Sequence, residues 1–223
     1  AFNRMQARLR RFLDDRTRML AAIGHDLRTP ITSLRLRAEF VEDEETRGRI
    51  LATLDEMQAM VEATLAFARE EAQSEPTRIV DLAALVDSTA ADLADLGAAI
   101  EVSPAERLPY ACRPVALRRA LRNLLENAVR YGDRCRVRVE REAAEVRVLV
   151  EDEGPGIPES LQERVFEPFV RLEESRSAET GGIGLGLAIA RSIVRAHGGD
   201  IRLANRPEGG LCVSLVLPQP ADR

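Results

Sequence analysis

The chain has 223 residues, 37 of them acidic and 32 basic, so it can bury one or two cores and is slightly acidic. The acidic balance argues against nucleic acid as the main partner, because a nucleic-acid-binding face would need concentrated positive charge. The sequence contains no lysine, which excludes a Walker-type phosphate loop, a Ser/Thr-kinase active site and Schiff-base chemistry.

The first predicted element is one long helix over residues 5–40. Its apolar side chains recur three, four or seven positions apart, as a heptad-like stripe of Leu13, Leu20, Ile23, Leu27, Ile31 and Leu34. After the acidic turn "EDEE", a second amphipathic helix is predicted over 45–72. A two-helix hairpin has too little surface to bury both stripes. We therefore expect two copies to pair as a four-helix bundle, which makes the protein a homodimer.

The segment "GHDLRTP", residues 24–30, lies on the first predicted helix. At about 100° per residue, His25 points roughly 160° away from the centre of the apolar stripe, and Thr29 shares its polar face. Asp26 can accept a hydrogen bond from one ring nitrogen, which leaves the other nitrogen as a nucleophile. Pro30 removes a helical hydrogen bond and predicts a kink. On residue types alone, a solvated histidine on a kinked helix explains the segment at least as well.

The small, polar segment "AQSEPT", residues 72–77, is predicted to be a linker. After it, helices are expected at about 82–95, 115–131 and 185–197. Between them lie the alternating strands "IEV", "CRVRVE", "EVRVLVE", "DIRLAN" and "LCVSLVLP". This order favours an α+β sandwich, with a mixed sheet covered by helices on one face.

The helix predicted over 115–131 carries a polar stripe besides its apolar face. Asn123, Asn127 and Arg130 fall within about 60° of one another. They could be a solvated surface, or a site where amide oxygens meet a hard cation and a guanidinium meets phosphate. Tyr131 ends the helix and offers a flat ring to a base.

Two glycine-rich turns follow. Asp152 ends a strand in "VEDEGPGIP", where Gly154 and Gly156 would let a flat ligand approach the backbone and the carboxylate could accept from the amine of adenine. The segment "GGIGLGLAIA" opens a helix, whose backbone N–H groups suit phosphates, with Gly182, Gly184 and Gly186. A Rossmann site is excluded, because no opening βα unit precedes these glycines and no second βαβ unit follows them.

The order of these segments resembles the sensor histidine kinases across essentially the whole chain. "HDLRTP" looks like their H box, "NLLENAVRYG" their N box, "DEGPG" their G1 box, "FEPFVR" their F box and "GIGLGLA" their G2 box. The resemblance implies an α+β protein in which a dimerising helical hairpin precedes an ATP-binding sandwich of the GHKL (Bergerat) type. It implies the end of a HAMP linker at 1–15, a dimerisation and histidine phosphotransfer domain at 16–72, a linker at 73–77 and a catalytic ATP-binding domain at 78–219.

The resemblance also implies roles in phosphoryl transfer. His25 would be the phosphoacceptor, Asp26 the acid that assists it, and Thr29 the residue that orients a water for dephosphorylation of a regulator. Asn127 would be a ligand of Mg²⁺, and Asn123 would support that site one turn earlier.

For the nucleotide, the resemblance implies that Arg130 contacts phosphate, Tyr131 packs against adenine and Asp152 reads its amine. A mobile ATP lid would span about 167–183, anchored by Phe166 and Phe169, with Arg171 as a candidate phosphate contact. The remaining residues implied to bind nucleotide belong to the glycine boxes: Gly154, Gly156, Gly182, Gly184, Leu185 and Gly186.

The implied substrate and metal are ATP and Mg²⁺, and the implied partners are a second copy and a response-regulator receiver domain of OmpR type, without direct nucleic-acid binding. The chain would be the cytoplasmic, soluble portion of an inner-membrane sensor. Two alternatives are a GHKL-type ATPase and a non-phosphorylating signalling scaffold. The H box and hairpin argue against the first, and the intact Asn127, Asp152 and glycines argue against the second.

Three further features are noted. Arg113 stands in "ACRPVAL" where many relatives carry an Asp-Pro pair. His197 in "AHGG" is expected to be structural, near a helix C-cap. The widely spaced cysteines are expected to be free thiols.

Overall fold

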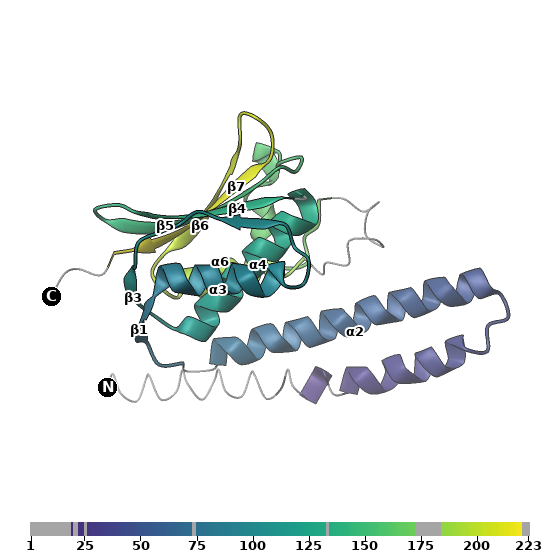
Figure 1. The fold of residues 1–223 in the computed structure, drawn as a ribbon. Helices are drawn as coiled ribbons and strands as arrows, with labels where there is room; N and C mark the ends of the chain where they lie inside the picture. The colour runs from purple at the N-terminus through teal and green to yellow at the C-terminus, as the bar shows by residue number, and fades with distance from the viewer. Residues whose placement is uncertain are drawn as a thin grey trace, which may run out of the picture. The chain divides into compact units, whose positions relative to one another are not determined.

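The computed structural model describes residue 19 and residues 22–24, 26–72, 75–132, 134–172 and 184–219, with side chains described except at 56 and 62–72. The chain divides into two compact units, residues 1–74 and residues 75–223 (Figure 1). We call them the helical unit and the sheet unit, and each is described by itself.

The helical unit is a hairpin of two antiparallel helices (Figure 1). Residues 22–24 and 26–38 are helical, with Pro30 inside the run, and the second helix is α2 (Glu44–Ala72). Asp43 starts α2, because its carboxylate accepts the backbone N–H of Thr46 at 2.8 Å. Hydrogen bonds from Thr46 hold the pKa of Asp43 below its ordinary value. None of the helices in the described parts of the chain is long and apolar enough to cross a bilayer.

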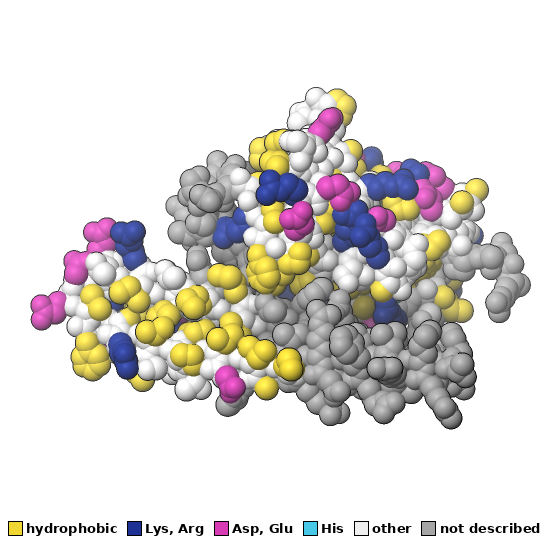
Figure 2. Space-filling view, turned by 180° about the vertical axis from the view of Figure 1, so that it is seen from behind, with side chains coloured by type: hydrophobic (Ala, Val, Ile, Leu, Met, Phe, Trp, Pro, Cys, Tyr) yellow, Lys and Arg dark blue, Asp and Glu magenta, His cyan; other side chains and the backbone are white. Residues whose placement is uncertain are grey.

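The hairpin buries only part of its apolar surface. Ile31, Ala38 and Leu54 are at most 5% exposed and are the buried apolar residues of the described hairpin. In contrast, Ile23, Leu27 and Leu34 of the predicted stripe keep 43–47% of their surface exposed. Hydrophobic side chains gather along the hairpin in the space-filling view (Figure 2). A single hairpin therefore leaves much of its stripe in water.

The sheet unit contains a five-stranded sheet in the order β2-β4-β5-β7-β6. β2 lies parallel to β4, and the other neighbours are antiparallel. The strands are β2 (Ile100–Val102), β4 (Cys135–Arg141), β5 (Glu145–Asp152), β6 (Asp200–Asn205) and β7 (Leu211–Pro218). One face is covered by α3 (Leu82–Ala94), α4 (Pro114–Gly132) and α6 (Gly186–Arg195) (Figure 1). This architecture confirms the α+β fold class.

Alternation along the strands separates the core from solvent. The inward residues Val146, Val148 and Val150 of β5 are at most 1% exposed and belong to the same core as the leucines of α4. On the other face, Arg138 and Glu151 form an ion pair at 2.6 Å between neighbouring strands. The sheet is thus apolar toward the helices and charged toward water.

A second, two-stranded sheet was not predicted from the sequence. β1 (Arg78–Asp81) pairs antiparallel with β3 (Pro109–Cys112). Asp81 then caps α3, because its Oδ1 accepts from the backbone N–H groups of Ala83 and Leu108, each at 3.1 Å. Two short 3₁₀ turns were also not predicted, η1 (Glu159–Leu161) and η2 (Arg164–Phe166).

The three cysteines are free, as expected. Cys112 and Cys135 are buried, and burial raises the pKa of Cys112 to about 11 and that of Cys135 to about 12. Both thiols are therefore protonated and unreactive at neutral pH.

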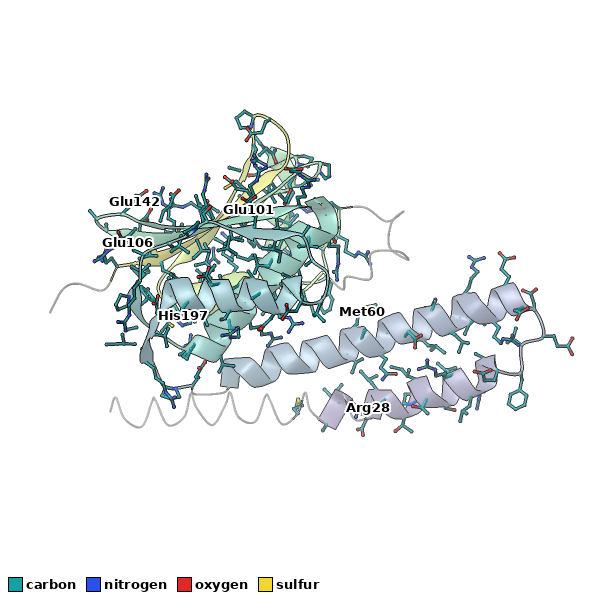
Figure 3. The ribbon with its side chains drawn as sticks, viewed as in Figure 1. Arg28, Met60, Glu101, Glu106, Glu142 and His197 are labelled. Carbon is teal, nitrogen blue, oxygen red and sulfur yellow. The ribbon has the colours of Figure 1, made fainter. Side chains whose placement is uncertain are left out.

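His197 connects the end of α6 to the start of α4 (Figure 3). Its Nε2 accepts the backbone N–H of Arg113 at 3.1 Å, and its Nδ1 donates to the carbonyl of Ile193 at 2.7 Å. The contact with Arg113 needs the neutral ring, because a protonated ring has no nitrogen that can accept a hydrogen bond. Burial, followed by the charge of Arg113, lowers the pKa of His197 against the opposing effects of Ile193 and Glu75.

This contact predicts a pH dependence of stability. A lowered pKa in the folded state means that His197 contributes stability above its unfolded pKa of about 6.5, and that this stability is lost as the pH falls below that value. We expect the unfolding free energy of the sheet unit to fall between pH 7.5 and 5.5, with a slope of up to about 1.4 kcal/mol per pH unit.

Both tyrosines, Tyr110 and Tyr131, lie in the sheet unit, and the chain has no tryptophan. Urea unfolding followed by tyrosine fluorescence therefore measures the stability of this unit. His197→Gln keeps an acceptor that does not titrate and should flatten the dependence; an equal slope in both proteins would contradict this role.

Candidate functional site

The segment around the predicted phosphoacceptor exposes its polar face. Asp26 and Thr29 are exposed on the first helix, whereas Ile31 on the same helix is only 4% exposed. This placement of Thr29 agrees with its predicted position away from the apolar stripe. His25 itself lies outside the described residues.

In the sheet unit, α4 carries the polar stripe. The opposite face is buried in the core through Leu117, Ala120, Leu121, Leu124, Leu125 and Ala128. Asn123 and Asn127 are half-buried at the boundary of that core, while Arg130 is exposed. Residues four apart stand one above the other on a helix, so the two amides point to one side.

The two asparagines lie beside the start of α6. A methyl group built on Gly186 would be 3.5 Å from Nδ2 of Asn127 and 3.8 Å from Cβ of Asn123. The Nδ2 of Asn123 is buried and has no hydrogen-bond partner within the part of the chain that the structure describes. An unpaired buried donor costs about 1–3 kcal/mol. The structure thus brings Asn123, Asn127 and Gly186 together around an amide that needs an acceptor.

Asp152, at the end of β5, is the only charged residue found buried in the described chain, with 6% of its surface exposed. Its Oδ1 accepts the backbone N–H of Gly154 at 2.9 Å and that of Leu211 at 3.0 Å. No described residue hydrogen-bonds the second oxygen, Oδ2. These contacts hold the carboxylate in place and leave one acceptor for a ligand donor such as an exocyclic amine.

Glycines allow close packing around Asp152. A Cβ on Gly132 would lie 2.5 Å from Cβ of Asp152, and one on Gly154 would lie 2.5 Å from the carbonyl oxygen of Tyr131. A Cβ on Gly210 would overlap the Asp152 carbonyl. The end of α4, with Tyr131 at 51% exposure, is therefore pressed against the carboxylate.

Gly156 packs against β6. Its missing side chain leaves room for Asn205, whose Oδ1 would lie 2.7 Å from an added Cβ, and its approach to a flat ligand stays a prediction. Asn205 in turn exchanges two hydrogen bonds of 2.8 Å with the backbone of Ile157. Gly156 thus has a positive φ of 72° because the turn is packed on β6.

The segment 173–183, which includes Gly182, lies outside the described residues, but its two flanks meet. The backbone N–H of Phe169 donates to the carbonyl of Gly184 at 3.0 Å. Gly184 has φ 74°, and an added Cβ would lie 2.8 Å from the carbonyl of Val170. Next to it, Leu185 is buried with 5% exposure and immediately precedes α6. Arg171 lies just before the segment and forms no ion pair with a described residue.

Sequence analysis missed Arg191, which holds the turn after β5 to α6. Its guanidinium lies 4.2 Å from the ring centroid of Phe166 and pairs with Glu163 at 2.7 Å and Asp200 at 2.9 Å. The hydrogen bonds to Glu163 raise the pKa of Arg191. Burial alone would raise the pKa of Asp200, but hydrogen bonds from Arg195 and Arg191 outweigh it and lower that pKa well below its usual range.

Also missed were Gly132, Gly210 and the backbone N–H of Leu211, which surround Asp152. Gly132 stands inside the segment "NLLENAVRYG", where a glycine at a helix end was the available signal. The other two come from the turn before β7, and only the tertiary structure brings them to Asp152.

Comparisons with known proteins agree with this geometry. Residues 15–73 match the "His Kinase A (phospho-acceptor) domain", and residues 112–221 match the "Histidine kinase-, DNA gyrase B-, and HSP90-like ATPase" family. The chain belongs to the sensor histidine kinases. This confirms the family inferred from the five boxes, and ATP is the nucleotide that the sheet unit binds.

The relatives cover both units. "Sensor histidine kinase GtrS" of Pseudomonas aeruginosa is 44% identical over 220 residues, which are 98% of this chain and 45% of that protein. The ATP-binding domain of PrrB from Mycobacterium tuberculosis is 30% identical, with a TM-score of 0.54 over 65% of this chain and 98% of that one. The chain spans about half the length of the curated relatives it matches.

The solved structures that are similar to this chain include one from the osmosensor EnvZ. The histidine kinase domain of Escherichia coli EnvZ is 33% identical, with a TM-score of 0.53 over 68% of this chain and 94% of that one. At 44% identity, GtrS is more similar in sequence to this chain than EnvZ is.

The family implies Mg²⁺, and the residues present fit this ion. The described residues contain no cluster of three or more His, Cys, Asp or Glu that could hold a metal. Mg²⁺ in nucleotide sites, however, keeps several waters and takes its other ligands from one or two protein oxygens and the phosphates. The amide oxygen of Asn127, beside the unpaired amide of Asn123, suits that arrangement.

The packing of Gly132 leads to a prediction. Gly132→Ala should raise helix propensity by about 1 kcal/mol, yet its Cβ would lie 2.5 Å from Asp152. We expect the clash to win, with a net loss of about 1–3 kcal/mol of stability and weaker ATP binding as Asp152 shifts. Urea unfolding and calorimetric ATP titration measure the two effects. Gly48→Ala, in α2 with nothing within 4 Å of the added Cβ, is the control and should lower neither stability nor ATP binding; an unaffected Gly132→Ala protein would contradict the assignment.

Proposed function

We propose that the chain is the kinase core of a sensor histidine kinase that phosphorylates His25 from ATP and passes the phosphoryl group to an aspartate of a response regulator. The observation that supports this most directly is the arrangement on α4. One end of the helix meets Asp152 with its unpaired Oδ2, and two turns earlier Asn123 and Asn127 lie beside the start of α6. A base and a phosphate chain can bind along such a helix.

In this proposal Asp152 accepts a hydrogen bond from the adenine amine, and the ring of Tyr131 packs on the base. Arg130 and Arg171 contact phosphates, and the amides of Gly184, Leu185 and Gly186 contribute donors. Asn127 holds Mg²⁺ with the support of Asn123, and the ion neutralises charge on the phosphates.

Phosphoryl transfer then needs positioning more than covalent help. A ring nitrogen of His25 forms a bond to the γ-phosphorus while the bond from that phosphorus to the β–γ bridging oxygen breaks, and ADP leaves. Asp26 accepts the proton or hydrogen bond of the other ring nitrogen. Thr29, exposed one turn further on, would orient the water that hydrolyses the phosphorylated regulator, so we propose a bifunctional kinase and phosphatase.

The proposed organisation follows the family. Residues 1–15 are the end of a HAMP linker, 16–72 the dimerisation and phosphotransfer domain, 73–77 a linker and 78–219 the catalytic domain. The whole protein is an inner-membrane sensor with this part in the cytoplasm, and the regulator is of OmpR type.

The test of the function is incubation with γ-labelled ATP and Mg²⁺. We expect acid-labile, base-stable label on the wild-type chain and none on His25→Gln, because only the imidazole provides the nucleophile. A matched control, Thr29→Ala, should be labelled like the wild type and lose regulator dephosphorylation. Label that survives on His25→Gln would overturn the assignment.

A second prediction concerns the dimer. Leu27 and Leu34 are 43% and 47% exposed on the apolar stripe of the hairpin, and burying the exposed part of each side chain in a bundle is worth roughly 1 kcal/mol. Leu27→Glu with Leu34→Glu should therefore convert a dimer to a monomer in light scattering. The control is Leu36→Glu, which is 64% exposed and two residues off the stripe. A double variant that stays dimeric would place the interface elsewhere.

A further inference from the structure

The first turn of α4 has no capping side chain of its own. Arg113 occupies the N-cap position, since its carbonyl accepts the backbone N–H of Leu117 at 2.9 Å. Pro114 follows it and has no N–H, so the donors that need partners are those of Val115 and Ala116. A guanidinium carries no acceptor and cannot satisfy them.

Glu75 satisfies both donors from 40 residues earlier in the sequence. Its Oε1 accepts from the N–H of Val115 at 2.8 Å, and its Oε2 accepts from that of Ala116 at 3.0 Å. A carboxylate is also the charge that the N-terminus of a helix favours. The backbone N–H of Arg113 donates to His197. With these three bonds, every backbone donor at the start of α4 has a partner.

The position of Glu75 in the chain gives this cap a second consequence. α2 ends at Ala72, and the first strand of the sheet unit begins at Arg78, which is paired with Cys112. Because Glu75 is fixed to α4, the chain from Ala72 to the sheet unit is three residue steps long, or at most about 11 Å. Without that contact it would be six steps, or about 21 Å.

The helix held in this way is the one that carries Asn123 and Asn127. The length of the connection limits the positions that the nucleotide can take relative to the hairpin. In an intramolecular reaction, a longer connection lowers the effective concentration of one partner at the other.

We propose that Glu75 is a positioning residue for phosphoryl transfer, whose carboxylate latches the linker to α4 and keeps the ATP-binding unit within reach of His25. The proposal rests on the proposed function. It adds a residue outside the five boxes, and it separates two effects of one carboxylate: capping α4 and shortening the connection.

Arg113 allows these two effects to be tested separately. Glu75→Ala removes both the cap and the latch. Arg113→Asp, added to Glu75→Ala, places an acceptor at the N-cap position and restores the cap while the linker stays released. Glu106→Ala is the control, because Glu106 is exposed (Figure 3) and forms no hydrogen bond or ion pair with a described residue.

Three quantities are measured at pH 8: the unfolding midpoint of the sheet unit by tyrosine fluorescence, the kcat and KM for ATP of His25 labelling, and the rate of trypsin cleavage after Arg78. Glu75→Ala should lower the midpoint by roughly 2–4 °C, as expected for a lost cap in a unit of this size. It should lower kcat roughly tenfold or more at unchanged KM, since a misplacement of about 1 Å can cost on the order of 100-fold. Cleavage should be several-fold faster.

The double variant decides between a latch and a cap. We expect its midpoint to return to the wild-type value while kcat stays low and cleavage stays fast. Recovery of kcat together with the midpoint would show that Glu75 is only a cap and would overturn the proposal, as would wild-type cleavage in Glu75→Ala. If the wild-type chain takes no label, the proposed function fails, whereas the cleavage rates and midpoints still decide whether the linker is latched.

Discussion

One side of α4 is apolar and buried against the sheet, and the other carries polar side chains. The site in the sheet unit depends on this difference between the two sides. Its leucines are at most 1% exposed against the sheet, and each such burial is worth roughly 1.5–3 kcal/mol. The helix therefore cannot rotate without exposing them. Because the rotation is fixed, Asn123 and Asn127 must face the start of α6. Hydrophobic packing thus sets the direction of the polar groups.

Asp152 shows how a charge is kept in that core without an ion pair. A buried carboxylate is costly unless hydrogen bonds satisfy it. Here two backbone N–H groups serve one oxygen, and glycines allow the surrounding backbone to approach closely enough. The donors are fixed by the turn after β5 and by the start of β7, so the carboxylate is oriented before any ligand arrives. Such preorganisation lowers the cost of binding.

The sequence predicted those parts of the structure that follow from local pattern. The strands 100–102, 200–205 and 211–218 have the expected bounds, because alternation and flanking turn residues define them. β1 and β3 were missed, because each has four residues and β1 shows no alternation of burial. In the site, helical spacing placed Asn123 and Asn127. The neighbours of Asp152 on Gly210 and Leu211 could not be predicted, because they depend on how β5 and β7 pair.

The contact between Phe169 and Gly184 has a consequence for how the family can vary. The hydrogen bond joins the residues on either side of the segment 173–183, so the two ends of that segment are already held together. For a flexible loop, doubling the length adds only about 0.6 kcal/mol of closure entropy. Insertions, deletions and changes of composition between those flanks are therefore cheap for the fold. The length and composition of this segment can therefore differ between relatives without a change in α6 or in the turn that carries Phe169.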